Sequence, residues 1–452
     1  MSDQCNLARD ITRTQAECFP LETLTLQHFP EPLDNLDRNR LKGKRVGLIV
    51  LSGYPFDARP RRTADALAQC GMTVDYICIK EGNAPLREKT NGINVFRVPF
   101  EHQRAGKLTY LFEYSAFILA SAAILAARSL SRRYDLIYVN NMPDILVASA
   151  LLPKMFGAGV ILDSHDPMPE LITTIFGKDQ SSLLVRAIQS LEKWSIACVD
   201  HVFTPNLACQ RLLSERSCQK EKITVLMNSP DEKIFAFRPV IPKPTAGSEP
   251  PFIVMYHGTL EKRNGIDLAI EGFARVRSKI PTAQLHVYGK VTPFLENVMQ
   301  SAREKGWDKN VVMHGQKSLE EIVTAIDDCD VGIIPNRVNA FTNINTPVRI
   351  FEYLARGKPV IAPRTSGIQD YFAEDSLVFF DPGNAEDLGR VMKVVASEPQ
   401  YALEIAERGQ QVYKAHLWQR ESSNLLAIIC EVLKNKSSYQ ARLRRNTSRD
   451  DY

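Results

Sequence analysis

The sequence predicts an α/β protein built from two consecutive doubly wound domains, and three observations support this. Short apolar runs alternate with longer amphipathic runs along most of the 452 residues, which is the pattern of βαβ units around a parallel sheet. The chain is longer than one hydrophobic core usually serves. A proline-rich segment interrupts the alternation near the middle, and the same pattern then starts again.

The first half of the chain supplies a series of predicted strands. Each is a short apolar run, and most are followed by a longer run with helical spacing. β-branched and aromatic residues are common in these runs, as expected for buried parallel strands. The predicted strands span residues 45–51, 73–79, 93–99, 135–140, 159–164, 201–205 and 223–228.

The segment 237–251 breaks this pattern. Its sequence, FRPVIPKPTAGSEPP, contains five prolines, so it cannot form a helix or a central strand, and we expect a linker between domains. The alternation then restarts, with helical runs such as 265–280 and 319–330. The predicted strands of the second half span residues 252–258, 284–289, 311–315, 331–335, 359–363 and 377–380.

These boundaries give a complete layout for the chain. The closing residues have helical spacing up to about 435, and the remainder is polar, which predicts a disordered tail. The predicted parts are an N-terminal extension (1–40), a first domain (41–236), the linker (237–251), a second domain (252–415), a crossing helix (416–436) and a polar tail (437–452).

The composition excludes several classes of protein. The net charge of +4 is small for the length, and no basic run with interleaved aromatic residues is present, so we expect no nucleic-acid partner. The nine cysteines are scattered without a C-x-x-C pair, which favours neither a zinc site nor a disulfide framework. The first residues lack the apolar core of a secretory signal. We therefore expect a cytoplasmic protein.

One segment has a membrane-like composition. Residues 108–133 are apolar for most of their length and end in basic residues. A spanning helix needs about 20 apolar residues, whereas Glu113 interrupts this segment and the run 114–127 is shorter. We expect a helix that is buried or docked on the protein, with contact to a membrane surface or a true span as alternatives.

Polar residues follow the predicted strands of the second half. The carboxyl ends of parallel strands meet at one edge of a sheet, where doubly wound domains bind ligands. Glycine, arginine and a helix N-terminus together favour a phosphate group. Taken alone, each residue is more simply explained as part of a turn or as a surface charge. Because they gather at one edge, together they favour a ligand-binding site. They are Gly258, Thr259, Lys262, Arg263, Gly289, Lys290, His314, Gly315, Arg337, Asn339, Thr342, Asn343, Asn345, Thr346, Pro347, Arg349 and Glu352.

The first half carries a matching set at its strand ends. The stretch SGYPFDARPRR follows the first strand, VNNMPD ends a later one, and LDSHDPMPEL ends the next. A buried strand that ends in this way directs His165 toward the space between the domains. The candidate residues are Gly53, Asp57, Arg59, Asn141, Asp163, His165 and Asp166.

Two other interpretations of the DSHD stretch are open. Asp or Ser before a helix is a common N-cap. Asp163, His165 and Asp166 together also contain metal-ligand side chains, although no further cluster supports a metal site. No G-x-S-x-G or G-x-x-x-x-G-K-[ST] motif is present, and no G-x-G-x-x-G follows the first strand of either domain, which argues against a nicotinamide or flavin oxidoreductase.

Three stretches of the second half resemble a known family. YHGTLEKRNGIDLAIEGF, LHVYGK and especially TPVRIFEYLARGKPVIAP are similar to the retaining GT-B glycosyltransferases of family four, also called glycosyl transferases group 1. The likeness extends in layout over about residues 44–430. It implies two Rossmann-like domains facing a central cleft, with a nucleotide-sugar donor on the second domain and the acceptor on the first. It implies no cofactor and no metal.

The resemblance also implies roles for single residues. Glu352 accepts hydrogen bonds from the ribose hydroxyls of the donor, and Arg349 lies near its diphosphate. His165 contacts the donor sugar, while Arg263 and Lys290 stabilise the leaving phosphate. The implied donor-binding residues are Gly258, Thr259, Gly289, His314, Gly315, Asn345, Thr346, Pro347, Arg349 and Glu352, and the acceptor-side residues are Gly53, Asp57, Arg59 and Asn141.

The sequence departs from the family pattern at three positions. Ile344 stands where the family often has a second glutamate, and Thr259 and Asn264 stand at two positions that the family's phosphate clamp gives to charged residues. Without the family, Arg349 and Glu352 would be a surface i,i+3 ion pair.

The function that the resemblance implies is transfer of a sugar from a UDP- or GDP-sugar to a lipid-linked or polysaccharide acceptor, on the cytoplasmic side of a membrane. The departures leave room for a binding or scaffold subunit without turnover. A nucleotide-sugar epimerase on the same two-domain plan is a third hypothesis, but the chain shows no additional carboxylate pair that would serve as its base.

Overall fold

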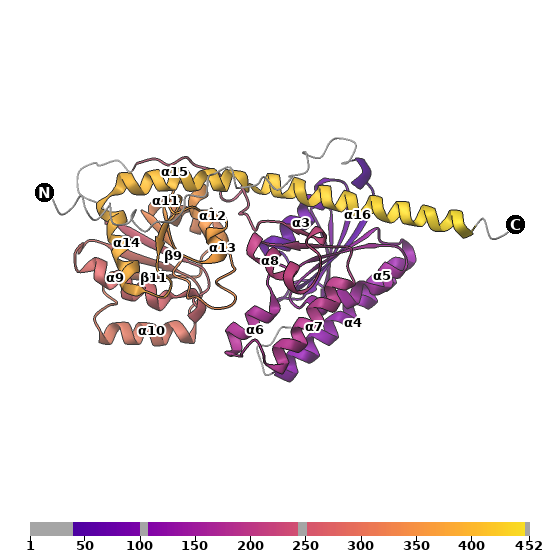
Figure 1. Ribbon diagram of the computed structural model, residues 1–452, viewed down its shortest axis with the longest axis horizontal. Helices are drawn as coiled ribbons and strands as arrows, with labels where there is room; N and C mark the ends of the chain where they lie inside the picture. Colours follow the sequence, from indigo (N-terminus) through magenta and orange to yellow (C-terminus); the bar gives the residue numbers. More distant parts are fainter. Residues whose placement is uncertain (1–38, 100–106, 243–250, 448–452) are drawn as a thin grey trace.

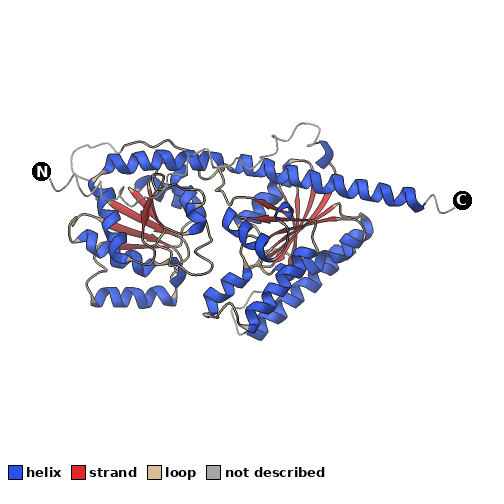
Figure 2. Cartoon of the chain, viewed as in Figure 1, coloured by secondary structure: helices blue, strands red, loops and turns tan. Residues whose placement is uncertain are grey.

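The protein folds into two α/β domains, each built around a mainly parallel sheet (Figures 1 and 2). The computed structural model describes residues 39–99, 107–242 and 251–447. Most of the N-terminal extension (1–38), much of the linker (243–250) and the last residues of the predicted tail (448–452) therefore lie outside the described residues. The predicted fold class of two doubly wound domains is confirmed.

The first domain contains an eight-stranded sheet in the order β3-β4-β2-β1-β5-β6-β7-β8. All neighbours pair in parallel except β3, which forms an antiparallel hairpin with β4. We did not predict β3, because its sequence, REKT, is polar and mostly exposed. The strands are β1 Arg45–Gly53, β2 Thr73–Ile79, β3 Arg87–Thr90, β4 Ile93–Val98, β5 Leu136–Asn140, β6 Gly159–Asp163, β7 His201–Thr204 and β8 Ile223–Val225.

Helices cover both faces of this sheet. On one face, Leu67 of α3 and Ile429 of α16 belong to the same core cluster as the strands. On the other face, Phe117 of α4 and Ile196 of α7 belong to a second cluster, together with residues of η2. The helices are α3 Ala58–Gln69, α4 Lys107–Ser131, η2 Asp144–Ala150, α5 Leu151–Met155, α6 Met168–Phe176, α7 Leu183–Ala197, α8 Leu207–Arg216 and α16 Trp418–Thr447.

The second domain contains a six-stranded parallel sheet in the order β11-β10-β9-β12-β13-β14. Helices α9, α10 and α14 share a core with one face, and α11 and α12 with the other. The strands are β9 Ile253–His257, β10 Gln284–Tyr288, β11 Val311–Gly315, β12 Val331–Ile333, β13 Val360–Pro363 and β14 Val378–Phe380. The helices are α9 Ile266–Arg277, α10 Pro293–Glu304, α11 Leu319–Asp328, α12 Val348–Ala355, α13 Ser366–Gln369, α14 Ala385–Ser397 and α15 Pro399–Ala415.

The strand orders fix where ligands can bind. In each sheet the order reverses next to the first strand, between β1 and β5 and between β9 and β12. Loops that leave adjacent strands at such a point diverge to opposite faces and open a crevice at the carboxyl ends. The segments after β9 and β12 are therefore neighbours, although about 75 residues separate the two strand ends in sequence.

The final helix, α16, returns from the second domain to the first (Figure 1). Leu425, Ile429 and Cys430 on this helix are buried in the first domain's core. Near its start, Glu421 accepts a hydrogen bond from the backbone N–H of Met227 at 3.1 Å. The helix continues to Thr447, past residue 436 where we predicted the crossing helix to end.

A buried ion pair ties the core of the first domain together. Arg59 of α3 donates two hydrogen bonds to Asp163 at the end of β6, at 2.9 and 2.7 Å, and a third to the carbonyl of Leu226 at 3.0 Å. Tyr138 also donates to Asp163. Both charged side chains are almost fully buried. The guanidinium of Arg59 is therefore engaged inside the domain.

We predict that Arg59→Leu lowers the free energy of unfolding by about 3–5 kcal/mol, because the buried Asp163 carboxylate loses its counter-charge. The double variant with Asp163→Leu removes both charges and recovers part of that loss. Urea unfolding midpoints measure both effects, with the exposed Arg303 changed to Leu as the matched control. Equal midpoints for Arg59→Leu and Arg303→Leu would contradict the prediction.

Candidate functional site

Three glycines close the ends of β9, β10 and β11 side by side. Gly258 donates to the Tyr288 carbonyl at 3.0 Å, and Gly289 donates to the Gly315 carbonyl at 2.8 Å. A Cβ on Gly289 would lie 2.2 Å from the Gly258 oxygen. A side chain at position 289 would therefore clash with the neighbouring backbone. Because these positions are glycines, a ligand can closely approach the backbone at the strand ends.

The loop between β9 and α9 is held by side-chain contacts to its own backbone. The Thr259 carbonyl accepts from Tyr256 and from Asn264, each at 2.7 Å. Gly265 has φ of 69°, and a Cβ there would lie 1.8 Å from the Pro335 oxygen. Asn264, which replaces a charged residue of the family pattern, therefore closes the loop.

Two cations lie beside this loop without a protein counter-ion. Arg263 is half-buried in the short turn before α9, and Lys290 is exposed after β10. Within the described ranges, neither side chain has a hydrogen-bond or ion-pair partner. Both charges are therefore available to an anion.

Glu352 on α12 is bound to His257 at the end of β9. Nε2 of His257 and Oε2 of Glu352 lie 2.6 Å apart, and the carboxylate side chain is 13% exposed. The other ring nitrogen, Nδ1, lies 2.9 Å from the Tyr353 hydroxyl. That hydroxyl also lies 2.9 Å from the Met255 carbonyl, so Tyr353 connects the ring to the backbone of β9. His257 is thus fixed on one side and holds one oxygen of Glu352 on the other.

The second carboxylate oxygen, Oε1 of Glu352, has no hydrogen-bond partner among the residues that the structure describes. A carboxylate held by one oxygen presents the other to a ligand in a defined orientation. Glu352 does not pair with Arg349, so the surface i,i+3 ion pair is not what the structure shows.

Arg349 instead points back toward the sheet. Its guanidinium donates to the His257 carbonyl at 2.7 Å and to Asn336 at 3.3 Å, and it stacks over the Tyr256 ring at 4.8 Å. These contacts join the first turn of α12 to the end of β9. The positive charge remains beside Gly258, whose hypothetical Cβ would lie 3.3 Å from the Arg349 side chain.

The segment between β12 and α12 joins the two domains. Asn206, which caps α8 in the first domain, donates to the Ile344 carbonyl at 2.8 Å and to Thr346 at 3.1 Å. Thr174 of α6 donates to Asn339 at 2.8 Å. At the family's second glutamate position, Ile344 thus contributes a backbone oxygen to the domain contact. Pro347 is the N-cap residue of α12, and Asn345 lies half-buried between Ile344 and Thr346.

The His165 loop of the first domain is organised by Asn141. The Asn141 side-chain oxygen accepts from the backbone N–H of His165 at 3.1 Å, and its amide donates to the Asp166 carbonyl at 2.7 Å. Nδ1 of His165 is buried, has no hydrogen-bond partner in the described ranges and lies 4.0 Å from Asp163. Because both carboxylate oxygens of Asp163 accept hydrogen bonds from Arg59, the geometry gives no support to a metal site at Asp163, His165 and Asp166.

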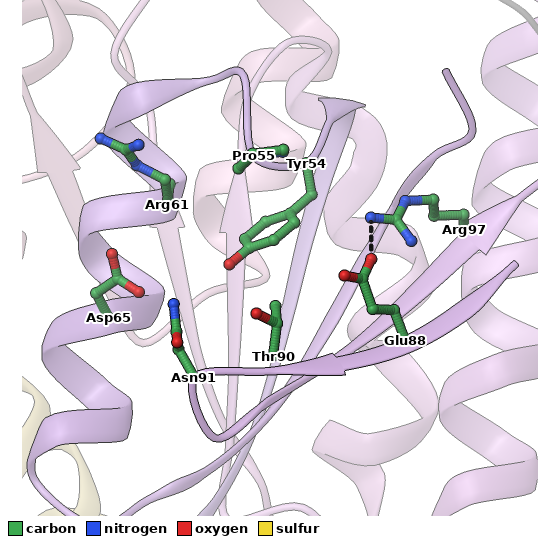
Figure 3. A pocket seen from close by; sticks show the side chains of 8 residues that line it. All are labelled: Tyr54, Pro55, Arg61, Asp65, Glu88, Thr90, Asn91 and Arg97. Carbon is green, nitrogen blue, oxygen red and sulfur yellow. Dashed lines mark hydrogen bonds and ion pairs between the residues drawn. The ribbon is translucent and has the colours of Figure 1, made fainter. Parts of the chain in front are cut away.

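The loop after β1 borders a separate cavity. Asp57 accepts from Ser52 at 3.1 Å, and a Cβ on Gly53 would lie 2.2 Å from Glu81. The cavity has a volume of about 350 Å³. Figure 3 shows the residues that line it: Tyr54, Pro55, Arg61, Asp65, Glu88, Thr90, Asn91 and Arg97. It belongs to the first domain and does not include the Glu352 site.

His314 is engaged within the sheet of the second domain. Its ring stacks on Tyr288 with centroids 4.3 Å apart, and Nε2 lies 3.2 Å from Nδ1 of His286. Burial lowers the pKa of His314, and Lys317 acts in the same direction. His314 therefore contacts β10 directly, in addition to lying at the same edge as Gly289 and Gly315.

Arg62 is a residue that the sequence analysis missed. It donates to Asn228 at 2.6 Å and lies over the Trp418 ring at 5.1 Å, buried at the boundary between the domains. Burial lowers the pKa of its guanidinium to about 10, and the Glu352 carboxylate acts in the opposite sense. Arg62 is therefore a buried cation of the first domain that packs against the start of α16. The only signal in the sequence was its place in the ARPRR run.

Two sequence families match the chain in succession. The Glycosyl transferase 4-like domain matches residues 57–229, and Glycosyl transferases group 1 matches residues 237–412. Together they cover most of the chain.

The chain belongs to the glycosyl transferases group 1 family. This confirms the resemblance predicted from the motifs around Glu352. The first match ends at residue 229, and the second begins at residue 237, where the predicted linker starts.

Two curated proteins are distant relatives. The putative colanic acid biosynthesis glycosyltransferase WcaL of Escherichia coli K12 is 24% identical over 173 residues, which are 38% of this chain and 41% of that protein. The sulfoquinovosyl transferase SQD2 of Arabidopsis thaliana is 21% identical over 305 residues, or 64% of this chain and 55% of that protein. The chain thus spans about half the length of the curated relatives that it matches.

Solved structures share the two-domain GT-B arrangement. Sucrose-phosphate synthase from Thermosynechococcus elongatus superposes with a TM-score of 0.70 at 19% identity, covering 87% of this chain and 100% of that one. Anabaena HepE in complex with UDP-glucose gives 0.61 at 14% identity, covering 86% and 99%. At these identities the likeness establishes the fold.

We predict that His257→Ala weakens nucleoside-diphosphate binding about ten- to hundredfold, because Glu352 loses the charge-assisted hydrogen bond that orients it. His257→Gln places an amide donor near the position of Nε2 and restores most of the affinity. Calorimetric titration with UDP and with GDP measures this, and thermal unfolding checks that each variant is folded. A folded His257→Ala variant with unchanged affinity would show that Glu352 is oriented without His257.

Asp144 lies behind the His165 loop and is fully enclosed. Burial raises the pKa of its carboxyl from 3.8 to about 7, Glu192 adds to the rise, and the hydrogen bond from Asn141 opposes it. Between these two values the folded state keeps a proton that the unfolded chain has lost. The free energy of unfolding therefore falls as pH rises through this window.

We predict that Asp144→Asn removes this dependence. The free energy of unfolding of the variant, minus that of the unchanged protein, should increase by roughly 2–3 kcal/mol between pH 5 and pH 8. Urea unfolding at the two pH values measures the difference, with exposed Glu215→Gln as control. A difference that stays constant with pH would refute the assignment of the raised pKa to Asp144.

Proposed function

We propose that the protein transfers a sugar from a UDP- or GDP-sugar to a lipid-linked or polysaccharide acceptor, with retention at the anomeric carbon. The observation that carries this proposal is the Glu352 carboxylate, fixed by His257 through one oxygen at the crevice between β9 and β12. A ribose offers two neighbouring hydroxyl donors, and a carboxylate with an unoccupied oxygen accepts them.

The charges around Glu352 suit the rest of the donor. Arg263 and Lys290 are cations without protein partners in the described ranges, and α12 directs its N-terminus toward the same edge. The open backbone at Gly258 and Gly289 lets a diphosphate approach closely. These cations and the helix N-terminus would therefore balance the charge of the diphosphate, so the proposal requires no metal ion.

The reaction proposed here is the one that the family resemblance implies. The bond between the anomeric carbon and the phosphate oxygen breaks as the acceptor oxygen attacks from the same face. The acceptor's proton passes to the departing phosphate, so no protein base is consumed. Arg263 and Lys290 stabilise the negative charge that develops on the leaving group. His165, on the loop that Asn141 holds, contacts the sugar from the first domain.

The acceptor belongs to the first domain in this proposal. The cavity after β1 offers cations at Arg61 and Arg97 and carboxylates at Asp65 and Glu88, a mixture that suits a hydroxyl-rich group (Figure 3). The named relatives give the acceptor class some support, since one is a putative colanic acid biosynthesis glycosyltransferase. All cysteines in the described ranges carry thiols, which fits a cytoplasmic location.

A second candidate function is donor binding without transfer. Ile344 stands where the family often has a glutamate, and its carbonyl is occupied by Asn206 of the other domain. A subunit of this kind would bind nucleotide but release no product. An epimerase would instead return an isomeric donor.

We predict that Glu352→Gln weakens donor binding about ten- to hundredfold, since the neutral amide is a poorer acceptor for the ribose hydroxyls. The experiment incubates the full chain with UDP- and GDP-sugars and follows binding by calorimetry and hydrolysis by mass spectrometry. The exposed Glu374→Gln is the matched control. Binding without hydrolysis or transfer favours the second candidate, and no binding of any nucleotide sugar rejects both.

A further inference from the structure

Helix α4 exposes most of an apolar surface. Its segment Phe112–Ser131 has a mean hydropathy of 1.4, and only 17% of it is buried. The side chains of Phe112, Leu119 and Leu130 are 73%, 70% and 91% exposed. In the described ranges this is the one helix long and apolar enough to cross a membrane. We expected a helix that is buried or docked on the protein, and the exposed outer face fits the docked form.

The inner face of α4 is built into the domain. Phe117 and Leu125 are fully buried in the core shared with β1 and β5. Arg128 donates to Asp75 of β2 at 3.1 Å, inside a cluster that also contains Arg45 and Tyr134. Crossing a bilayer would remove these side chains from the core and separate the buried Asp75 from a counter-charge. The helix therefore lies on the protein with its outer face uncovered.

Neighbouring helices extend this surface. Helix α4 contacts η2 and α5, and η2 contacts α7. Figure 1 shows α4, α5 and α7 along one side of the first domain, away from α16. On α5 and α7, Met155 and Leu183 are 82% and 83% exposed. We call this surface the apolar face and define it by Phe112, Leu119, Leu130, Met155, Leu183 and Trp194.

The charges on the apolar face have one sign. In segments 112–133, 151–157 and 183–197, the exposed ionisable residues are Arg132, Arg133, Arg186 and Lys193. The two acids in these segments, Glu113 and Glu192, are buried. Arg133 also lies over the Phe156 ring at 5.5 Å, which places a cation beside the apolar side chains. Exposed apolar groups with basic side chains match the interface of an anionic bilayer.

We propose that the apolar face docks the protein on a bilayer containing anionic phospholipids, with α4 and α7 lying in the plane of the interface. A second copy of the chain fits this surface poorly, because a two-fold interface would place the same basic residues against one another. Docking does not depend on sugar transfer.

The docked surface leads toward the proposed active site. Helix α6 contacts α7 and begins directly after the His165 loop. Ile175 at its end is 52% exposed, while the adjacent Thr174 bonds to Asn339 of the second domain. A lipid-linked acceptor held in the membrane would therefore reach the domain boundary along α6. This last step rests on the proposed function.

The test is sedimentation of the full chain with vesicles of phosphatidylcholine alone or of an equimolar mixture with phosphatidylglycerol. We expect at least about tenfold stronger binding to the anionic vesicles, with loss at high salt because basic residues supply the attraction. The combined variant Leu119→Glu, Met155→Glu, Leu183→Glu should lose about tenfold in binding, since it removes apolar contact and adds negative charge. Leu319→Glu, on α11 of the second domain, is the matched control.

Two further measurements make each outcome decisive. Thermal unfolding and nucleoside-diphosphate binding should be unchanged in the triple variant, because these side chains are exposed on helices of the first domain, whereas Glu352 lies on α12 of the second. Equal binding of the triple variant and the Leu319→Glu control would overturn the proposal. Absence of vesicle binding by the unchanged chain would also overturn the proposal. If the unchanged chain is a dimer and the triple variant is a monomer, the apolar face is instead an interface with a second copy. If the unchanged chain binds vesicles but binds no nucleoside diphosphate, only the proposed function is rejected.

Discussion

The hydrogen bond between His257 and Glu352 connects the fold to its chemistry. One partner ends the central strand of the second sheet and the other lies on the helix that follows β12, so the bond spans the crevice at the switch point. The Tyr353 hydroxyl, bonded to the backbone of the same strand, fixes the ring from behind. The carboxylate is thus oriented by groups that the sheet itself positions, and no mobile side chain is needed to place it.

The same crevice depends on contacts between domains. Asn206 and Thr174 of the first domain bond to the segment that precedes α12. A donor seated at Glu352 would therefore lie against a segment whose conformation both domains determine. Helix α16 adds a second connection, because its apolar side chains complete the first domain's core. The relation between the domains is part of the site.

The first domain has three distinct surfaces with different chemistry. Its strand ends face the second domain, the cavity after β1 is lined by paired charges, and α4, α5 and α7 present apolar and basic side chains. Exposed apolar patches of large area often mark sites of interaction with other proteins or with membranes. If that surface meets a bilayer, the proposed donor site on the other domain would remain exposed to dissolved nucleotide sugars. Such a division would let one molecule join a soluble donor to a membrane-held acceptor.

The sequence by itself determined the two sheets, nearly every strand and the edge at which the polar residues gather. Alternating apolar runs record which side chains are buried, and strand-end glycines such as Gly289 record where backbones approach. The motif around Glu352 was sufficient to predict the family. The polar strand β3 was missed because no apolar run marks it.

Only the tertiary structure decided which groups meet. His257 and Glu352 are 95 positions apart, and Arg59 and Asp163 are 104 apart, so no local pattern records either pair. Arg59 was expected on the acceptor side, but its guanidinium is bonded inside the core. Whether α4 is covered was equally undecided, because an apolar helix has the same sequence pattern when it is buried as when it is exposed. Burial depends on what packs against a residue, and that is a property of the whole fold.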